Sequence, residues 1–321
     1  MRVLVPASVW EPLTVRAAAL SPAIDLLPYE EEGDTPDHAE EAQAVFRWIA
    51  GKRYEPLLLN APHARWLHTA SAGVDHVLTP ALKSALPERG ITLTDSGPAF
   101  GVCIGEWVLA WMLAVTHKLP QLLHMQRERK WEWVAQKELY EQTVGIIGLG
   151  PIGRGVAERC RAMGMRTLGL RRSSTPEPSV DETLTGSDGL QRILTESDWV
   201  VLAAASTPET RALLGTEELA QMKTTARLIN IARGALVDES ALIHALQTGQ
   251  IAGACLDVFT REPLPQDSPL WNLPNVYVTP HTSPGWTNGL QKRQLDLFLQ
   301  NLERFLRDEP LHSVVDINRG Y

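Results

Sequence analysis

Short, unbroken apolar runs alternate with longer runs of helical spacing along the first part of the chain. Before about residue 96 the apolar runs predict strands, and one amphipathic run predicts a helix. We expect strands at residues 3–5, 57–59, 64–68 and 91–94 and a helix at 37–50. This alternation indicates a small α/β domain.

The alternation becomes more regular after residue 143. Strands are expected at 144–147, 166–170, 199–204, 227–231, 251–258 and 276–279, and helices at 151–163, 187–195, 216–222, 238–247 and 287–307. Nearly continuous apolar strands that alternate with helices are typical of a parallel, doubly wound sheet covered on both faces.

Two further segments lie between these regions. Residues 101–119 form a helical run that is apolar nearly all round, which predicts burial between domains or against a second subunit. Residues 121–142 carry mixed charge together with Trp131 and Trp133, so we expect this segment to cover another surface. A homodimer formed through residues 101–142 is our hypothesis.

A glycine turn follows the strand expected at 144–147. Gly148 permits the tight turn, Gly150 lets a pyrophosphate approach the backbone, and Gly153 lets the new helix pack on the strand. The first N–H groups of that helix then point at the phosphates. Residues 148–153, which include Leu149, Pro151 and Ile152, therefore predict a dinucleotide site, with a purely structural turn as the alternative.

The end of the next strand indicates which dinucleotide is bound. A free ribose 2′-OH is normally held by Asp or Glu at this point, whereas a 2′-phosphate needs Arg. The chain has Arg171, Arg172 and Ser173 there, and no carboxylate before Glu177. This predicts a preference for NADP(H), with NAD(H) possible; the alternative is a solvated basic turn.

Composition narrows the class of protein. A length of 321 residues with 44% hydrophobic residues predicts about two domains, and a net charge of −8 with scattered basic residues argues against nucleic-acid binding. The three cysteines are far apart, so we expect buried, reduced thiols and no disulfide or metal site. The N-terminus resembles a strand rather than a signal peptide, and the most apolar stretch, 107–115, is short for a membrane span. We expect a cytoplasmic protein with a small-molecule substrate and no membrane partner.

Three candidate catalytic side chains follow strand ends, where open α/β sheets bind ligands. Arg233 follows 227–231, Glu262 follows 251–258, and His281 follows 276–279. Reduction of a 2-oxo acid requires a cation for the carboxylate and a proton donor for the carbonyl oxygen. Arg233 and His281 fit these roles, and Glu262 would favour the protonated imidazole and fix its tautomer. Individually, each could be an ordinary surface charge.

A fourth candidate is the loop at residues 71–75. Gly73 in such a loop can leave backbone N–H groups free to hold an anion, although an ordinary loop is the alternative.

The segments 148–153, 230–238, 256–264 and 279–282, in this order, resemble the D-isomer-specific 2-hydroxyacid dehydrogenase family. The resemblance implies that Arg233, Glu262 and His281 are the catalytic residues and that the loop amides at Ala72, Gly73 and Val74 hold the substrate carboxylate. It also implies that Asp257 binds the nicotinamide carboxamide. Further cofactor contacts are expected at Ala204, Ala205, Ile231, Ala232 and Ser283.

The same resemblance implies two doubly wound domains with a cleft between them. A flavodoxin-like substrate domain would comprise 1–98 and 287–321, and a Rossmann-type domain 99–286. The endings at 268–271 and 319–321 resemble the NADPH-preferring glyoxylate/hydroxypyruvate reductase branch, and Trp286 is a candidate for shaping the substrate pocket. The alternatives are a dinucleotide-sensing corepressor-like regulator and an NAD-dependent phosphoglycerate dehydrogenase.

Overall fold

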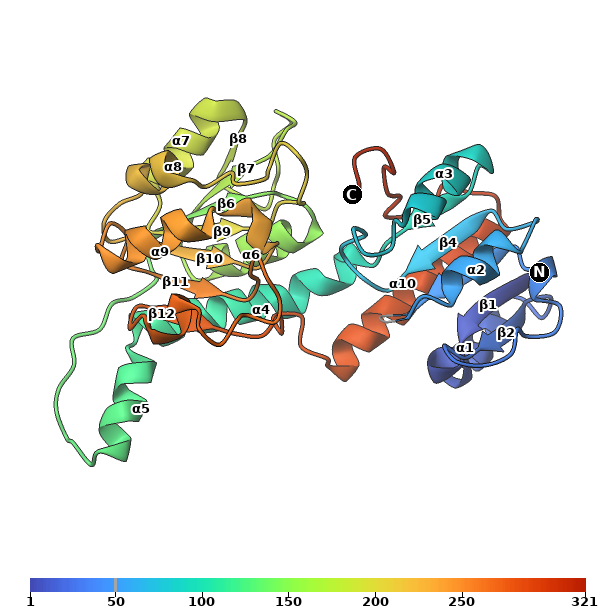
Figure 1. Ribbon diagram of the computed structural model, residues 1–321, viewed down its shortest axis with the longest axis horizontal. Coiled ribbons are helices and arrows are strands. Elements are labelled where there is room, and N and C mark those ends of the chain that lie inside the picture. The colour runs from blue at the N-terminus through green and yellow to red at the C-terminus, as the bar shows by residue number, and fades with distance from the viewer. Residues whose placement is uncertain (49–50) are drawn as a thin grey trace. The chain divides into compact units, whose positions relative to one another are not determined.

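The computed structural model describes residues 1–48 and 51–321. They form two compact units, Met1–Phe100 with Trp286–Tyr321, and Gly101–Gly285 (Figure 1). The sequence places the two boundaries after residues 98 and 286. Both units are built on a parallel sheet, which confirms the predicted α/β fold class.

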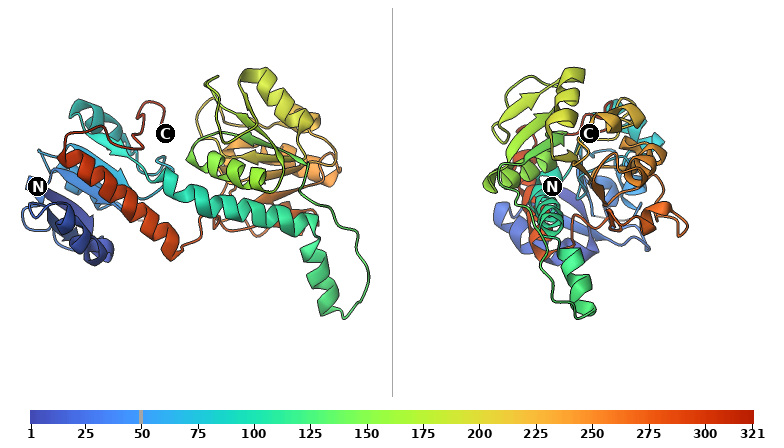
Figure 2. Two further views of the ribbon diagram at one scale, coloured as in Figure 1. Left: turned by 180° about the vertical axis from the view of Figure 1, so that it is seen from behind. Right: turned by 90° about the vertical axis from the view of Figure 1, so that its left-hand side faces the viewer.

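The first unit contains a five-stranded parallel sheet in the order β2-β1-β3-β4-β5. Its two faces bury different helices: α1 and α10 pack against Val3 and Phe46, whereas α2 and α3 pack against Leu4 and Val45. Figure 2 shows α10 lying along the sheet. The strands are β1 (Arg2–Pro6), β2 (Asp25–Tyr29), β3 (Ala44–Arg47), β4 (Trp66–Thr69) and β5 (Thr92–Thr94), and the helices are α1 (Ala7–Leu20), α2 (Tyr54–Leu59), α3 (Pro80–Glu88) and α10 (Asn288–Leu306), with a 3-10 turn at Ala39–Glu41.

Two sequence predictions in this unit are wrong. The helix expected at 37–50 is a 3-10 turn followed by strand β3, with residues 49–50 lying outside the described part of the chain. All four β3 residues are buried, and a strand covered on both faces lacks the alternation that distinguishes strands from helices. The strand expected at 57–59 is instead the end of α2, which buries Leu57 and Leu58.

Some elements of the structure have no counterpart in the predictions. Helix α1 contains Pro12, a residue that normally ends helical patterns. Strand β2 contains Pro28, and it lies at the edge of its sheet, where a missing N–H is tolerated. The short strand β8 was also not expected.

The second unit contains a seven-stranded parallel sheet in the order β12-β11-β10-β9-β6-β7-β8. The strands are β6 (Thr143–Ile147), β7 (Arg166–Leu170), β8 (Glu182–Leu184), β9 (Trp199–Leu202), β10 (Arg227–Asn230), β11 (Gly253–Leu256) and β12 (Val276–Val278). The helices are α5 (Leu119–Arg127), α6 (Pro151–Ala162), α7 (Gly186–Glu196), α8 (Thr216–Gln221) and α9 (Glu239–Gln247), with 3-10 turns at Gly234–Leu236 and Pro269–Asn272. The strands and helices predicted here are confirmed, with small differences at their ends.

Helix α4 (Gly97–Thr116) is the most apolar helix and is longer than the stretch considered in the sequence. Its 20 residues reach a mean hydropathy of 1.7, so among the described residues it is long and apolar enough to cross a membrane, contrary to our estimate from 107–115. Half of that window is buried within the protein. A Cβ at Gly105 would lie 2.7 Å from the carbonyl oxygen of Gly155, which shows close backbone packing against α6. A helix that packs this closely against α6 belongs to the protein core.

Helix α5 and the segment after it project from the second unit (Figures 1 and 2). We call residues 119–136 the arm. Trp131 and Trp133 are 101% and 88% exposed, so within this chain they cover nothing.

Candidate active site

The second sheet aligns its carboxyl ends at one edge. The strand pairings put one residue from each strand in a single row: Leu184, Leu170, Ile147, Leu202, Asn230, Leu256 and Val278. The glycine turn, the arginine pair and the three candidate catalytic residues all follow members of this row. The sheet therefore brings to one edge groups that are far apart in sequence.

The glycine turn has the geometry of a phosphate-binding turn. Gly148 has φ +102° and its missing Cβ would lie 2.6 Å from the Ala204 backbone, while a Cβ at Gly153 would lie 1.9 Å from the Gly148 carbonyl oxygen. Neither position can accept a side chain. A Cβ at Gly150 would meet nothing within 4 Å, so the space beside the start of α6 is open. This open approach to the first N–H groups of α6 fits a dinucleotide pyrophosphate.

The end of β7 carries both signs of charge. Arg171 Nη1 lies 3.3 Å from Glu177 Oε2, and Arg154 Nη1, in the first turn of α6, lies 3.7 Å from the same oxygen. Arg154 also donates a hydrogen bond to the Leu149 carbonyl of the glycine turn. The chain thus folds the Glu177 carboxylate back between two guanidiniums, a placement that the sequence reasoning missed because Glu177 lies outside the usual spacing.

Arg172 and Ser173 are placed less tightly. Arg172 Nη2 lies 3.8 Å from Glu209, and both side chains are largely exposed. Ser173 donates its hydroxyl to Thr175.

Arg233 follows β10 in a segment held by hydrogen bonds from side chains to the backbone. Its Nη1 donates to the Ala232 carbonyl at 2.8 Å, and Asn230 anchors the turn by bonding the Arg233 carbonyl and the Ala232 N–H. A Cβ at Gly234 would lie 1.9 Å from the Phe259 carbonyl carbon. The loop that carries Arg233 therefore touches the loop that leads to Glu262.

Asp257 organises the loop that carries His281. The Asp257 side chain is fully buried and accepts hydrogen bonds from Thr279 Oγ1 and from the N–H groups of Thr282 and Ser283, at 2.5, 2.8 and 2.8 Å. The His281 N–H donates to the Asp257 carbonyl. His281 has φ +53°, a backbone region that is costly for a residue with a side chain and typical of functional sites.

His281 and Glu262 form a pair. His281 Nδ1 lies 2.8 Å from Glu262 Oε2, and Glu262 Oε1 accepts the Phe259 N–H at 3.0 Å. Because a carboxylate only accepts, Nδ1 carries a hydrogen and Nε2 is left for a ligand. The β10 and β12 ends that present Arg233 and His281 are two strands apart, about 10 Å. The edge thus presents a cation and an oriented imidazole on loops that follow strand ends about 10 Å apart.

In the first unit, the loop at 71–75 follows β4. Ser71 donates its hydroxyl to the Gly73 carbonyl, and within 1–48 and 51–321 the N–H groups of Ala72, Gly73 and Val74 make no hydrogen bond. The 4% exposed Arg47 donates to Thr69 Oγ1 at 3.1 Å, and Thr69 Oγ1 lies 2.9 Å from Ser71 Oγ.

Arg47 is a buried cation that the sequence reasoning missed. Burial lowers its pKa, and its guanidinium lies over the Tyr54 ring. The sequence contained a sign of this buried cation, because Arg47 directly follows the apolar residues of β3. It was overlooked because the region was predicted to be helical.

For the remaining candidate cofactor and substrate contacts, the structure gives their position and burial. Ile231, Ala232 and Ser283 are buried at the carboxyl edge, and Trp286 is 69% exposed. Burial raises the pKa of the Cys160 and Cys255 thiols to about 12, whereas Cys103 is only half-buried. Among the described residues, His38, Glu40 and Glu41 lie close enough to share a metal ion, and all three are exposed.

A parallel sheet with a glycine turn, an open helix N-terminus and charged groups along one edge defines a dinucleotide-binding α/β protein. The family model "D-isomer specific 2-hydroxyacid dehydrogenase, NAD binding domain" matches residues 109–283. A glyoxylate/hydroxypyruvate reductase B of Pectobacterium carotovorum is 38% identical over 72% of both chains. The chain belongs to the D-isomer-specific 2-hydroxyacid dehydrogenase family.

Other similarities agree. A D-3-phosphoglycerate dehydrogenase of Synechocystis is 35% identical over 89% of this chain and 51% of its own length, so the chain spans about half the length of such relatives. A D-isomer specific 2-hydroxyacid dehydrogenase from Xanthobacter autotrophicus Py2, solved with NADPH and MES, is 30% identical with a TM-score of 0.84, covering 100% of this chain and 99% of that one.

Proposed function

We propose that the protein is an NADPH-dependent reductase of small 2-oxo acids, with glyoxylate and hydroxypyruvate as lead substrates and D-2-hydroxy acids as products. The observation that carries the proposal is the His281–Glu262 pair at 2.8 Å, two strand ends from Arg233 on the edge that holds the glycine turn. The name of the Pectobacterium relative supports the substrate class.

The roles of the side chains follow from their chemistry. A bound nicotinamide supplies the hydride. Arg233 binds the substrate carboxylate and polarises the carbonyl through its N–H groups. His281 Nε2 gives a proton to the carbonyl oxygen, while Glu262 holds the Nδ1 hydrogen and stabilises the charged ring before transfer. The loop amides at 72–74 are proposed carboxylate donors.

The dinucleotide would bind with its pyrophosphate at residues 148–153 and its adenosine ribose beside Arg171. NADP(H) is the proposed preference because Arg171, Arg172 and Arg154 gather at the end of β7, and the Xanthobacter neighbour was solved with NADPH. The carboxamide contact expected of Asp257 is replaced by a positioning role, because its fully buried carboxylate accepts its hydrogen bonds from the loop that carries His281. A kcat/KM ratio that favours NADH over NADPH would contradict the preference.

We also propose a cytoplasmic homodimer that covers the exposed Trp131 and Trp133 of the arm. Light scattering at micromolar concentration tests this, since a monomeric mass would refute the dimer.

The activity is tested by following reduced-nicotinamide absorbance with a panel of 2-oxo acids and each cofactor. We expect the highest kcat/KM for glyoxylate or hydroxypyruvate with NADPH. Absence of turnover with every 2-oxo acid would refute the proposal and favour a sensing role.

A second candidate is phosphoglycerate dehydrogenase activity with NAD. The Glu177 carboxylate at the end of β7, where an acidic residue suits a ribose 2′-OH, and the Synechocystis relative favour it. Oxidation of 3-phosphoglycerate with NAD in the same assay, faster than any reduction with NADPH, would select it.

A further inference from the structure

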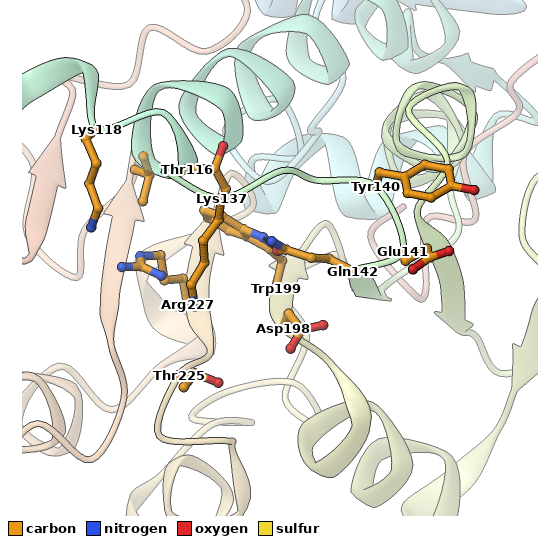
Figure 3. A pocket seen from close by; sticks show the side chains of 11 residues that line it. Thr116, Lys118, Lys137, Tyr140, Glu141, Gln142, Asp198, Trp199, Thr225 and Arg227 are labelled. Carbon is orange, nitrogen blue, oxygen red and sulfur yellow. Dashed lines mark hydrogen bonds between the residues drawn. The ribbon is translucent and has the colours of Figure 1, made fainter. Parts of the chain in front are cut away.

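A cavity of about 330 Å³ lies in the second unit, away from the residues that follow the strands (Figure 3). Asp198 and Trp199 at the start of β9, Arg227 at the start of β10 and Gln142 just before β6 line it. The cavity is therefore at the amino edge of the sheet, opposite the candidate active site. Val115, Thr116 and Lys118 from the end of α4, and Lys137, Tyr140 and Glu141 from the returning chain, complete it with Thr225.

Cations outnumber available anions in this cavity. Lys118, Lys137 and Arg227 line it, against Asp198 and Glu141. Asp198 is already engaged, since one of its oxygens bonds Lys223 Nζ at 3.0 Å and the other accepts the Thr143 N–H at 2.9 Å. Figure 3 shows the charged ends of Lys118 and Arg227 at one end of the cavity and Glu141 at the other. The first end is a site of unbalanced positive charge.

Arg227 is the centre of that site. Its guanidinium lies over the Trp199 ring, with 5.7 Å to the ring centroid, and no carboxylate among the described residues pairs with it. Burial lowers the pKa of Arg227, the direction expected when a cation loses water without gaining a counterion. A desolvated cation is costly unless an anion compensates it, and the five N–H donors of a guanidinium suit an oxyanion.

The two lysines come from opposite ends of the arm. Lys118 precedes residues 119–136 and Lys137 follows them, and both line the same cavity. Two hydrogen bonds already join these ends, from the Lys137 N–H to the Thr116 carbonyl at 3.1 Å and between His117 Nδ1 and Gln136 Oε1 at 2.8 Å. Because both lysines line one cavity, an anion bound there would attract the two ends of the arm.

We propose that this cavity binds a phosphate group, either inorganic phosphate or a small phosphomonoester, through Arg227, Lys118 and Lys137. Binding would stabilise the base of the arm, where residues 116–118 meet residues 136–137. The site is separate from the candidate active site, so the inference does not depend on the proposed activity.

The test is calorimetric titration of inorganic phosphate, and separately of glycerol 1-phosphate, at constant ionic strength. NADP⁺ is kept saturating so that the glycine turn is filled. We expect saturable binding, with Kd raised at least tenfold in Arg227→Gln and in Lys118→Gln. Arg127→Gln removes the same charge from the arm outside the cavity and should bind like the wild type.

Tighter binding of glycerol 1-phosphate would identify an ester site, and equal or weaker binding a free-ion site; both support the proposal. Absence of saturable binding, or unchanged Kd in both cavity variants, overturns it. Lys118 is half-buried at the surface, so Lys118→Gln remains informative if Arg227→Gln fails to fold.

Stabilisation of the base of the arm has its own readout. Phosphate should slow amide hydrogen exchange of the Lys137 N–H, which bonds the Thr116 carbonyl, several-fold in the wild type and not in Lys118→Gln. Equal exchange rates with and without phosphate would refute the effect on the arm.

Discussion

The two sheets present loops at their carboxyl ends by different means. In the second sheet, neighbouring loops meet backbone to backbone, as at Gly148 and Gly234, where a Cβ would lie 2.6 and 1.9 Å from another loop, and the Asp257 side chain adds hydrogen bonds. In the first sheet, the support comes from a cation and an imidazole: Arg47 bonds Thr69, and the fully buried His68 lies 2.7 Å from Thr94 Oγ1 and 3.1 Å from Ser96 Oγ.

The difference has physical consequences. Backbone contacts do not titrate and leave little freedom, which suits groups that must hold a fixed geometry during chemistry. The contribution of a buried polar side chain to stability depends on its protonation state, because a charge without a partner is costly in the interior. We therefore expect substitutions in the second sheet to affect turnover and cofactor binding, and those in the first sheet to affect stability in a pH-dependent way.

The largest expected effect is that of His281→Ala. Loss of the proton donor should lower kcat by about 10²–10⁴-fold with little change in KM. Arg233→Ala should also raise KM, because it removes carboxylate binding. Steady-state kinetics measure both, with His244→Ala, an exposed histidine on α9, as a control that should remain active. Near-wild-type kcat in His281→Ala with any 2-oxo acid would refute the mechanism.

A pair of glycine variants separates packing from binding in the second sheet. Gly153→Ala should destabilise the protein by about 1–3 kcal/mol or more, because its Cβ would lie 1.9 Å from a backbone oxygen. Gly150→Ala should cost no more than about 1 kcal/mol, yet weaken dinucleotide binding, because its Cβ would enter open space at the phosphate site. Urea denaturation and cofactor titration measure these effects. Equal stability of the two variants would contradict the assignment of Gly153 to helix packing and of Gly150 to phosphate binding.

Glu177→Gln tests the carboxylate at the end of β7. Without its charge, Arg171 and Arg154 lose an anion that competes with a 2′-phosphate, so the Kd for NADPH should fall roughly threefold to tenfold, within about 1.4 kcal/mol. The Kd for NADH should not improve.

The matched control is Glu182→Gln, because Glu182 pairs with Arg166 and Arg192 instead. Weaker NADPH binding in Glu177→Gln would mean that Glu177 positions the arginines rather than competing for them.

The last prediction concerns the stability of the first sheet and tests His68. Complete burial lowers its pKa to about 3 from an ordinary 6.5, so the folded protein keeps it neutral while the unfolded chain takes up a proton. Stability from this residue is present above about pH 6.5 and is lost as the pH falls towards 3.

Melting temperatures of wild type and His68→Gln from pH 7 to pH 4 measure this contribution, and the wild type should lose more stability. Comparison at each pH is required because burial raises the pKa of Asp95 to about 6, which acts in the opposite direction. Parallel curves for the two proteins would contradict the prediction.

The sequence was most informative where local pattern and tertiary role coincide. In the second unit each strand except β8 is a short apolar run followed by a turn, so these strands and the residues after them could be predicted together. In the first unit, β3 is buried on both faces and was mistaken for a helix, which hid Arg47. Glu177 was discounted because spacing along the chain does not reveal that residues 172–177 fold back onto Arg171.

By itself, the sequence determined the parallel α/β class, the glycine turn and the identity of the groups at the strand ends, since these follow from periodicity and residue chemistry. Only the tertiary structure decided the Glu177 contact with two arginines, the anchoring of the His281 loop by Asp257 and the basic cavity at the opposite edge. Such contacts join residues far apart in the chain, and their positions depend on strand order and packing rather than on any local pattern.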